Sequence, residues 1–311
     1  MRTNGPSTAR ERAHCHRNSS QISIPACSPT KEARPRRRSA AFSMTSMKSA
    51  RKTKGARLGQ HFLTGAWAAH SLAQSAGIKP GERVLEIGPG KGALTRELLT
   101  TGGHVLAIEK DEALSQGLSG TFAAEMESGA LQVVAADIRD FEPSRHNLAA
   151  GGYVLAANIP YYITGEIIRQ FLETDAQPRA MALLIQKEVA DRIIARNGKE
   201  SILSLSVKAY GVPKIIAKVS RGNFSPPPSV DSAILLIENI SKKFFDEFDE
   251  GAFFKVVKAG FSSKRKFLAN NLSVFGKEAV LQAFEVCGLS AKVRAEDVPL
   301  EKWKKFAREL S

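Results

Sequence analysis

The chain has 311 residues and a formal net charge of +14 at neutral pH. This length suits one large domain plus a small one. The three cysteines lack C-x-x-C spacing and the six histidines are scattered, so we expect a reduced cytoplasmic protein with no metal site. No apolar run is long enough to cross a bilayer, which argues against a membrane protein.

Residues 1–54 hold most of the positive charge, with 13 Lys and Arg against two acidic residues. They are rich in Ser, Arg, Pro and Thr and poor in large apolar side chains, which predicts a disordered basic extension. We favour translation starting near Met44 or Met47, with the upstream stretch a gene-model artefact. An organellar transit peptide is the alternative. Residues 55–311 keep a net charge of only +3, so the overall charge does not predict RNA binding by them.

Residues 55–240 alternate strand-like apolar runs with helical segments. This alternation predicts an α/β domain with a parallel sheet covered by helices on both faces. Helices are expected at 93–99 and 163–172. The last two strands should form a hairpin-like edge around Pro226-Pro227-Pro228. Strands are expected at 84–87, 104–108, 131–136, 153–157, 180–185, 214–219 and 232–238.

A glycine-rich turn follows the first of these strands, with glycines at positions 88, 90 and 92. This alternate spacing differs from G-x-G-x-x-G and argues against a pyrophosphate site and a dehydrogenase. The next strand ends at Glu109, which can accept from both ribose hydroxyls. The third ends at Asp137, which suits the amine of an adenine. We therefore expect Gly88, Gly90, Glu109 and Asp137 to bind an adenosine whose site makes no provision for phosphates.

The fourth strand ends in Asn158-Ile159-Pro160-Tyr161. An adenine N6 amine is a poor nucleophile, and two acceptors for its N–H bonds would direct its lone pair at an electrophile. The Asn158 side-chain oxygen and the Ile159 carbonyl can be these acceptors. Pro160 stiffens the turn and Tyr161 can stack on the purine. The alternative is an ordinary tight loop with an Asx cap.

The loop that begins Phe224-Ser225-Pro226 is expected to form a rigid lip on the edge of the sheet, because a proline run cannot continue a central strand. Phe224 could stack on a base extruded from RNA, opposite Tyr161. The alternative is that Phe224 fills the core beside the loop.

Residues 241–311 change character and predict a small, all-helical domain, with helices at 252–260, 264–272 and 277–287. Lys264, Arg265 and Lys266 are the best local candidates for RNA contacts, since phosphate contacts tolerate cations that fan around a helix. The alternative is a solvated helix start. For Lys187-Glu188, a structural role in shaping the RNA cleft is at least as good an interpretation as direct contact with RNA.

An ordered series of motifs from about Gly55 onward resembles the ribosomal RNA adenine N6,N6-dimethyltransferase family. The sequence departs from the commonest bacterial pattern at His61, where Asn is more usual. The motifs are Gly59–Leu63, Glu86–Gly90, Glu109, Asp137, Asn158–Tyr161, Gln186–Ala190, Phe224–Ser232 and Phe261–Lys266.

The resemblance implies a Rossmann-like class I methyltransferase domain over residues 55–240 and a helical RNA-binding domain over 241–311. It implies transfer of methyl groups from S-adenosylmethionine to N6 of two adjacent adenosines near the 3′ end of small-subunit (16S) rRNA. It favours stacking by Phe224 and RNA contact by residues 264–266, and we expect a monomer that acts on the assembling small ribosomal subunit. The implied cofactor contacts are His61, Leu63, Gly88, Glu109, Asp137 and Asn158.

Two rival interpretations remain. The large-subunit rRNA methyltransferases that confer macrolide resistance share the Asn-Ile-Pro-Tyr turn, although Gln186–Val189 and Phe261–Lys266 are more similar to the dimethyltransferase branch. The second rival is a binding factor built on a degenerate methyltransferase fold. Arguing against it are the intact residues Gly88, Glu109, Asp137 and Asn158.

Overall fold

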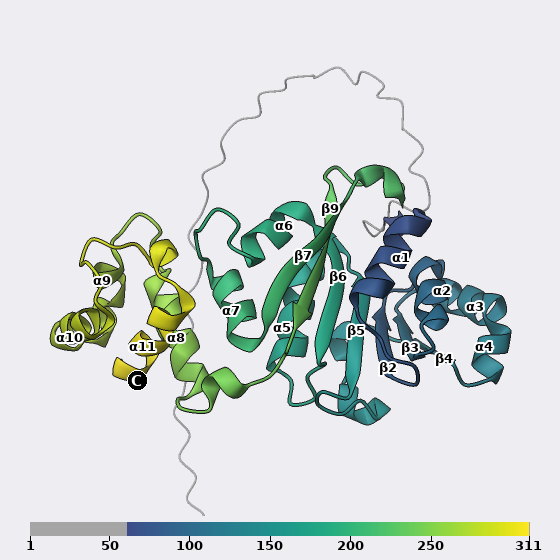
Figure 1. Cartoon of the computed structure of the whole chain (residues 1–311), viewed down its shortest axis with the longest axis horizontal. Helices are drawn as coiled ribbons and strands as arrows, with labels where there is room; N and C mark the ends of the chain where they lie inside the picture. The colour runs from purple at the N-terminus through teal and green to yellow at the C-terminus, as the bar shows by residue number, and fades with distance from the viewer. Residues whose placement is uncertain (1–60, 311) are drawn as a thin grey trace, which may run out of the picture. The chain divides into compact units, whose positions relative to one another are not determined.

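The computed structural model describes residues 61–310, so the predicted extension over residues 1–54 lies outside the described part of the chain. A seven-stranded sheet has the order β4-β3-β2-β5-β6-β9-β7, and only β9 runs against its neighbours (Figure 1). The predicted sheet is confirmed. Its strands are β2 (Arg83–Ile87), β3 (His104–Glu109), β4 (Leu131–Ala135), β5 (Tyr153–Asn158), β6 (Ala180–Gln186), β7 (Val212–Val219) and β9 (Ser232–Glu238).

The central strands are apolar on both sides because helices cover both faces of the sheet. Along β2, Val84 packs into one core, whereas Leu85 and Ile87 pack into the core on the opposite face. One core includes residues of α1 and α2, and the other includes residues of α5 and α7. The helices of this part are α1 (Ala66–Ser75), α2 (Ala93–Thr100), α3 (Glu112–Thr121), α4 (Ala123–Glu127), α5 (Thr164–Glu173), α6 (Lys187–Ile193) and α7 (Ile202–Tyr210).

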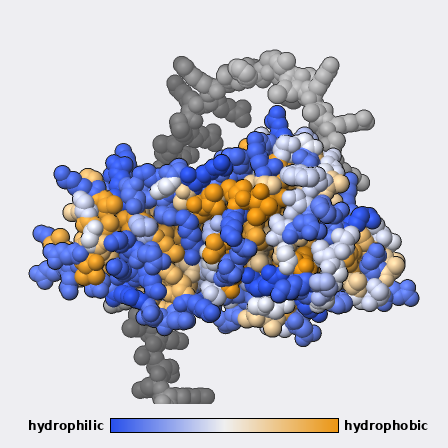
Figure 2. All heavy atoms as spheres, in the orientation of Figure 1, coloured by the Kyte–Doolittle hydropathy of each residue, from blue (hydrophilic) through white to orange (hydrophobic). Residues whose placement is uncertain are grey.

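The predicted pairing of the last two strands is present, with β7 at the edge of the sheet and antiparallel to β9. Apolar surface covers this region of the molecule (Figure 2), where Val212 and Ile216 of β7 are exposed. Pro213 and a register irregularity next to Ile216 interrupt the regular edge, which discourages pairing with a further strand. A separate two-stranded sheet joins β1 (Phe62–Leu63) to β8 (Phe224–Ser225).

The described chain after β9 is helical and has a core of its own. Its largest fully buried side chains are Trp303, Phe253 and Phe306, and this core extends onto α7 through Leu205 and Ala209. The boundary at residue 240 stays a prediction, with β9 ending just before it. The helices are α8 (Glu250–Gly260), α9 (Leu268–Asn271), α10 (Lys277–Cys287) and α11 (Leu300–Glu309).

The helix predicted over 264–272 is wrong at its start. Lys264–Lys266 lie in an exposed turn, and α9 begins only at Leu268, the first fully buried residue after them. Asn271 stabilises this turn, because its side-chain amide donates to the carbonyls of Gly260 and Ser263. A buried polar side chain therefore holds the backbone where the helical pattern of the sequence would continue it.

Between residues 61 and 310, no helix is both long and apolar enough to span a membrane. In the same range, no three His, Cys, Asp or Glu side chains are grouped so that they could hold a metal ion.

Candidate active site

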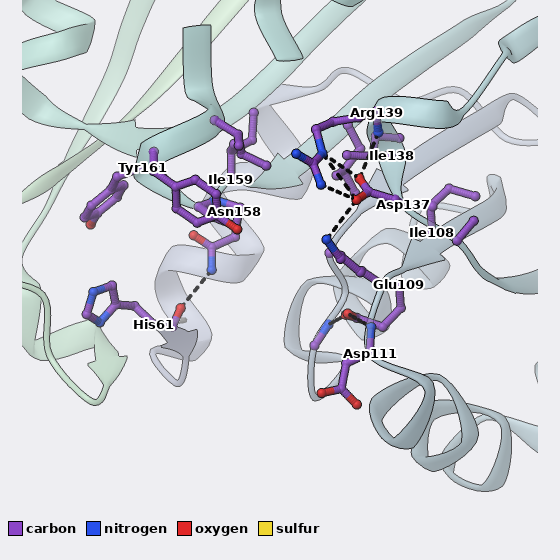
Figure 3. A pocket seen from close by; sticks show the side chains of 18 of the residues that line it. His61, Ile108, Glu109, Asp111, Asp137, Ile138, Arg139, Asn158, Ile159 and Tyr161 are labelled. Atoms are coloured by element: carbon purple, nitrogen blue, oxygen red, sulfur yellow. Dashed lines mark hydrogen bonds and ion pairs between the residues drawn. The ribbon is translucent and has the colours of Figure 1, made fainter. Parts of the chain in front are cut away.

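A pocket of about 270 Å³ lies where β2, β3 and β5 end (Figure 3). The carboxyl ends of parallel strands meet at one edge of a sheet, which is where open α/β folds bind ligands. The fold thus brings together most of the residues predicted from separate strand ends. Those that line the pocket are His61, Gly88, Gly90, Glu109, Asp137, Asn158, Ile159, Pro160 and Tyr161.

The glycine turn has a backbone that other residues rarely adopt. Gly88 and Gly90 have φ values of 64° and 59°, in the left-handed region that favours glycine. A Cβ atom on Gly90 would approach the ring of Phe62 to 3.1 Å, whereas the space beside Gly88 is open. A ligand can therefore lie directly against the backbone at Gly88.

Glu109 ties this turn to the end of β3. Its two carboxylate oxygens accept from the backbone N–H groups of Gly90, at 3.0 Å, and Asp111, at 2.9 Å. The residue is only 4% exposed and yet lines the pocket. The two hydrogen bonds hold the carboxylate rigidly. Each oxygen retains a lone pair, so the carboxylate can still accept from a ligand hydroxyl.

Asp137 lies between two cations that the sequence analysis did not identify (Figure 3). Arg139 donates to both carboxylate oxygens, with its closest contact at 2.6 Å, and Lys110 lies at 2.8 Å. These hydrogen bonds, those from Arg139 first, hold the pKa of Asp137 well below its usual range. A possible signal was present, since a basic residue directly follows Glu109 and another lies two positions after Asp137.

The pocket fits an adenosine moiety on chemical grounds. Ile108 and Ile138 give it apolar walls suited to a purine ring. Asp137 and Glu109 line the pocket with carboxylates, which are acceptors of the kind that an exocyclic amine and ribose hydroxyls require. Open space beside the Gly88 backbone completes a site that could hold S-adenosylmethionine.

Asn158 is oriented by one hydrogen bond. Its side-chain Nδ2 donates to the carbonyl of His61 at 3.1 Å, which fixes the amide so that Oδ1 is the atom left to accept (Figure 3). The next residue, Ile159, is 1% exposed and anchors the turn in the core. Asn158 can therefore present an acceptor to the pocket from a rigid support.

Tyr161 is also fixed in place. Its hydroxyl makes a 2.8 Å hydrogen bond with Ser232 of β9, and its ring lies 5.8 Å from the imidazole of His61, centroid to centroid. His61 in turn donates from Nδ1 to the carbonyl of Pro226 at 2.8 Å. His61, at the start of the described chain, thus links the turn at residues 158–161 to the proline loop.

The position of Phe224 does not favour its expected stacking role. Phe224 is 4% exposed, packs in the sheet core and does not line the pocket. Its backbone pairs with Leu63, and this two-stranded ladder draws the ring inward. The alternative that Phe224 fills the core is correct for this conformation. Leu63 itself is buried too, and it borders the glycine turn rather than the main pocket.

Glu86, under the glycine turn, gives a prediction about stability. It is fully buried, and this burial raises its pKa to about 8, although the neighbouring Thr95 acts in the opposite direction. Above about pH 4.5 the unfolded chain releases a proton that the folded protein keeps, so the free energy of unfolding falls from there to about pH 8.

The Glu86→Gln variant cannot ionise and should escape this loss. Chemical denaturation should show it more stable than the wild type at pH 8, by on the order of a few kcal/mol, and little different at pH 4. Glu127→Gln, at an exposed position, serves as the control. Equal pH dependence of Glu86→Gln and the wild type would show that Glu86 is ionised in the folded protein.

The strand order, the glycine turn after β2 and the acidic strand ends define a class I methyltransferase fold. The 23S rRNA methyltransferase ErmE shares it with a TM-score of 0.66 and 25% identity, over 80% of this chain and 99% of that one. A dimethyladenosine transferase from Plasmodium falciparum shares the fold with a TM-score of 0.69 and 24% identity, over 79% of this chain and 96% of that one.

Within this class, the family described as ribosomal RNA adenine dimethylase matches residues 51–311, and the chain belongs to it. Ribosomal RNA small subunit methyltransferase A of Dehalococcoides mccartyi (strain CBDB1) is 38% identical over 257 residues, 82% of this chain and 87% of the relative. The protein of that name from Deinococcus radiodurans is 39% identical over 250 residues, 78% and 81% of the two chains.

Proposed function

We propose that the protein transfers methyl groups from S-adenosylmethionine to N6 of two adjacent adenosines near the 3′ end of small-subunit rRNA, giving N6,N6-dimethyladenosines. The observation that carries this proposal is the oriented Asn158 amide at the edge of an adenosine-shaped pocket. Membership of the adenine dimethylase family supports the same reaction. The name of the bacterial relative supports small-subunit rRNA as the substrate. We further propose that the protein is cytoplasmic and acts as a monomer on the assembling small subunit.

S-adenosylmethionine supplies an electrophilic methyl group when bound. Glu109 and Asp137 would hold its adenosine part, with the Gly88 backbone alongside. Asn158 Oδ1 and the Ile159 carbonyl accept from the two N–H bonds of the substrate amine, and Tyr161 packs on its ring. The chain then contributes mainly by positioning, and the methylated nitrogen releases its proton to solvent.

The choice between small- and large-subunit rRNA rests on the relatives. The relatives at 38–39% identity carry small-subunit names, whereas the 23S rRNA enzyme is matched at 25%. Labelled S-adenosylmethionine should be incubated with small and with large subunits that lack the modifications. Label in the small subunit alone supports the proposal, and label confined to the large subunit would place the protein in the macrolide-resistance branch.

Lys264, Arg265 and Lys266 remain our proposed RNA contacts. All three are exposed, and Lys264 borders a groove between α5, α7 and α8. Within the described residues, two more cations of this groove, Arg192 and Lys258, likewise have no acidic partner. Three of its acids have cationic partners: Glu173 pairs with Arg169, Glu200 with Lys208 and Glu296 with Lys199. Glu250 accepts from the Tyr210 hydroxyl and keeps its charge. Among the described residues of the groove, three unpaired cations against this one acid favour a phosphate backbone.

Replacing Lys264, Arg265 and Lys266 by Ala should raise the KM for small subunits and flatten its dependence on salt, because fewer phosphates are neutralised. A variant lacking residues 1–46 is the comparison. It should lose nonspecific RNA affinity but keep its turnover on small subunits. The measurement is kcat/KM for both variants at two salt concentrations. A silent triple substitution together with an inactive truncation would place RNA recognition at the other end of the chain.

A further inference from the structure

Tyr162 is an exposed aromatic residue on the wall of the candidate active site. Its side chain is 70% exposed, and it lines the same pocket as Asn158 and Tyr161. Within residues 61–310, neither its hydroxyl nor its ring has a hydrogen-bond or stacking partner. Scattered exposed aromatic residues are ordinary on protein surfaces. Tyr162 differs from Trp67 and Phe267, which are also exposed but line no such pocket.

The backbone that carries Tyr162 is held on both sides. It belongs to the short helix η4 (Tyr161–Ile163), where Tyr161 is fixed by its hydrogen bond to Ser232. On the other side, Ile163 packs against the sheet core and donates its backbone N–H to the carbonyl of Pro160 at 3.1 Å. The Tyr162 ring is therefore a platform on a rigid support, and binding a flat group to it would order only the ring itself.

The pocket holds about 270 Å³, on the scale of a single nucleoside, so the nucleotide next to a target adenosine must lie outside it. Bases of single-stranded RNA bind aromatic side chains by stacking, and a purine offers a larger face than a pyrimidine. Phe224, which was expected to stack on a base, is buried and is not exposed for stacking in this structure. Tyr162 supplies an exposed ring on the wall of the pocket.

We propose that Tyr162 stacks on the nucleotide adjacent to the adenosine being methylated, and so makes the enzyme prefer a purine neighbour. This inference rests on the proposed function, because it assumes that the pocket takes an adenosine of rRNA. The strand has one polarity and Tyr162 one position, so the ring can stack on the neighbour at one side of the target adenosine only, and we expect the purine preference at that side. Tyr162 is then a specificity-determining residue with no part in the methyl transfer itself.

The test combines changes in the enzyme with changes in the substrate. Reconstituted small subunits would carry adenosine, guanosine or uridine at one of the two target positions and adenosine at the other. Tyr162→Ala should raise the KM for the natural subunits about tenfold, within the range produced by removing a stacked aromatic, and leave single-turnover rates at saturating substrate nearly unchanged. Tyr162→Phe should behave as the wild type. Trp67→Ala is the matched control, since it removes an aromatic exposed by 56% that lies outside the pocket.

The substrate series decides the specificity. The wild type should methylate the guanosine-containing subunit much better than the uridine-containing one, and Tyr162→Ala should lose this difference. An unchanged KM, an unchanged preference, or a loss of S-adenosylmethionine affinity in Tyr162→Ala would each overturn the inference while leaving the proposed function in place. Failure of the wild type to methylate any adenine N6 would instead overturn the proposed function, and this inference with it.

Discussion

Asn158→Ala should slow methyl transfer on the order of 100-fold in single-turnover experiments at saturating cofactor. The amide of Asn158 is oriented by its donation to the His61 carbonyl, so its Oδ1 is a preorganised acceptor for the substrate amine. Removing one such positioned polar group from a reacting centre typically lowers the rate constant by roughly 10²–10³.

Tyr161→Phe is the matched comparison for this prediction. It keeps the ring face and loses only the hydrogen bond to Ser232, so we expect a loss of about fivefold or less. Saturating cofactor separates chemistry from binding, because Asn158 also lies beside the proposed cofactor site. Equal rate losses in the two variants would contradict the roles assigned to them. Full activity of Asn158→Ala would remove the residue from the mechanism.

Glu109→Ala and Asp137→Ala should each weaken S-adenosylmethionine binding by roughly 10- to 150-fold, the equivalent of losing one hydrogen bond to a charged group. Each carboxylate is held in place before any ligand arrives, Glu109 by two backbone N–H groups and Asp137 by Lys110 and Arg139. Titration calorimetry gives the dissociation constants directly.

Asp140→Ala provides the control for both substitutions, because this carboxylate is exposed and lies outside the pocket. Its affinity for the cofactor should match that of the wild type. Asp137 also accepts from the backbone N–H of Arg139, so the melting temperature of each variant must be measured alongside. Wild-type affinity in both folded variants would show that the cofactor binds elsewhere.

Much of the fold could be predicted because its signals are local. The strand Ser232–Glu238 and the helix Lys277–Cys287 have the predicted bounds, since each is an apolar pattern flanked by clear breaks. Strand ends also predicted the candidate site well, because a parallel sheet brings them to one edge whatever the intervening helices do.

The differences arise at specific side-chain contacts and strand pairings, some between distant parts of the chain. Phe224 is exposed or buried depending on its pairing with Leu63, which is far from it in sequence. The turn at Lys264–Lys266 depends on Asn271 and its contacts to two carbonyls. The clamp on Asp137 needs Lys110 from the end of a neighbouring strand. None of these contacts leaves a periodic pattern in the sequence, and only the basic residues beside Glu109 and Asp137 give a local signal.

The most direct test of the central claim is to map the methyl groups themselves. Small subunits lacking the modification would be incubated with the wild type or with Asn158→Ala, and the rRNA digested and analysed by mass spectrometry. We expect N6,N6-dimethyladenosine at two adjacent positions near the 3′ end with the wild type, and almost none with Asn158→Ala. Methylation at another atom or in another region of the rRNA, or equal dimethylation by both proteins, would contradict the function and the site proposed for this chain.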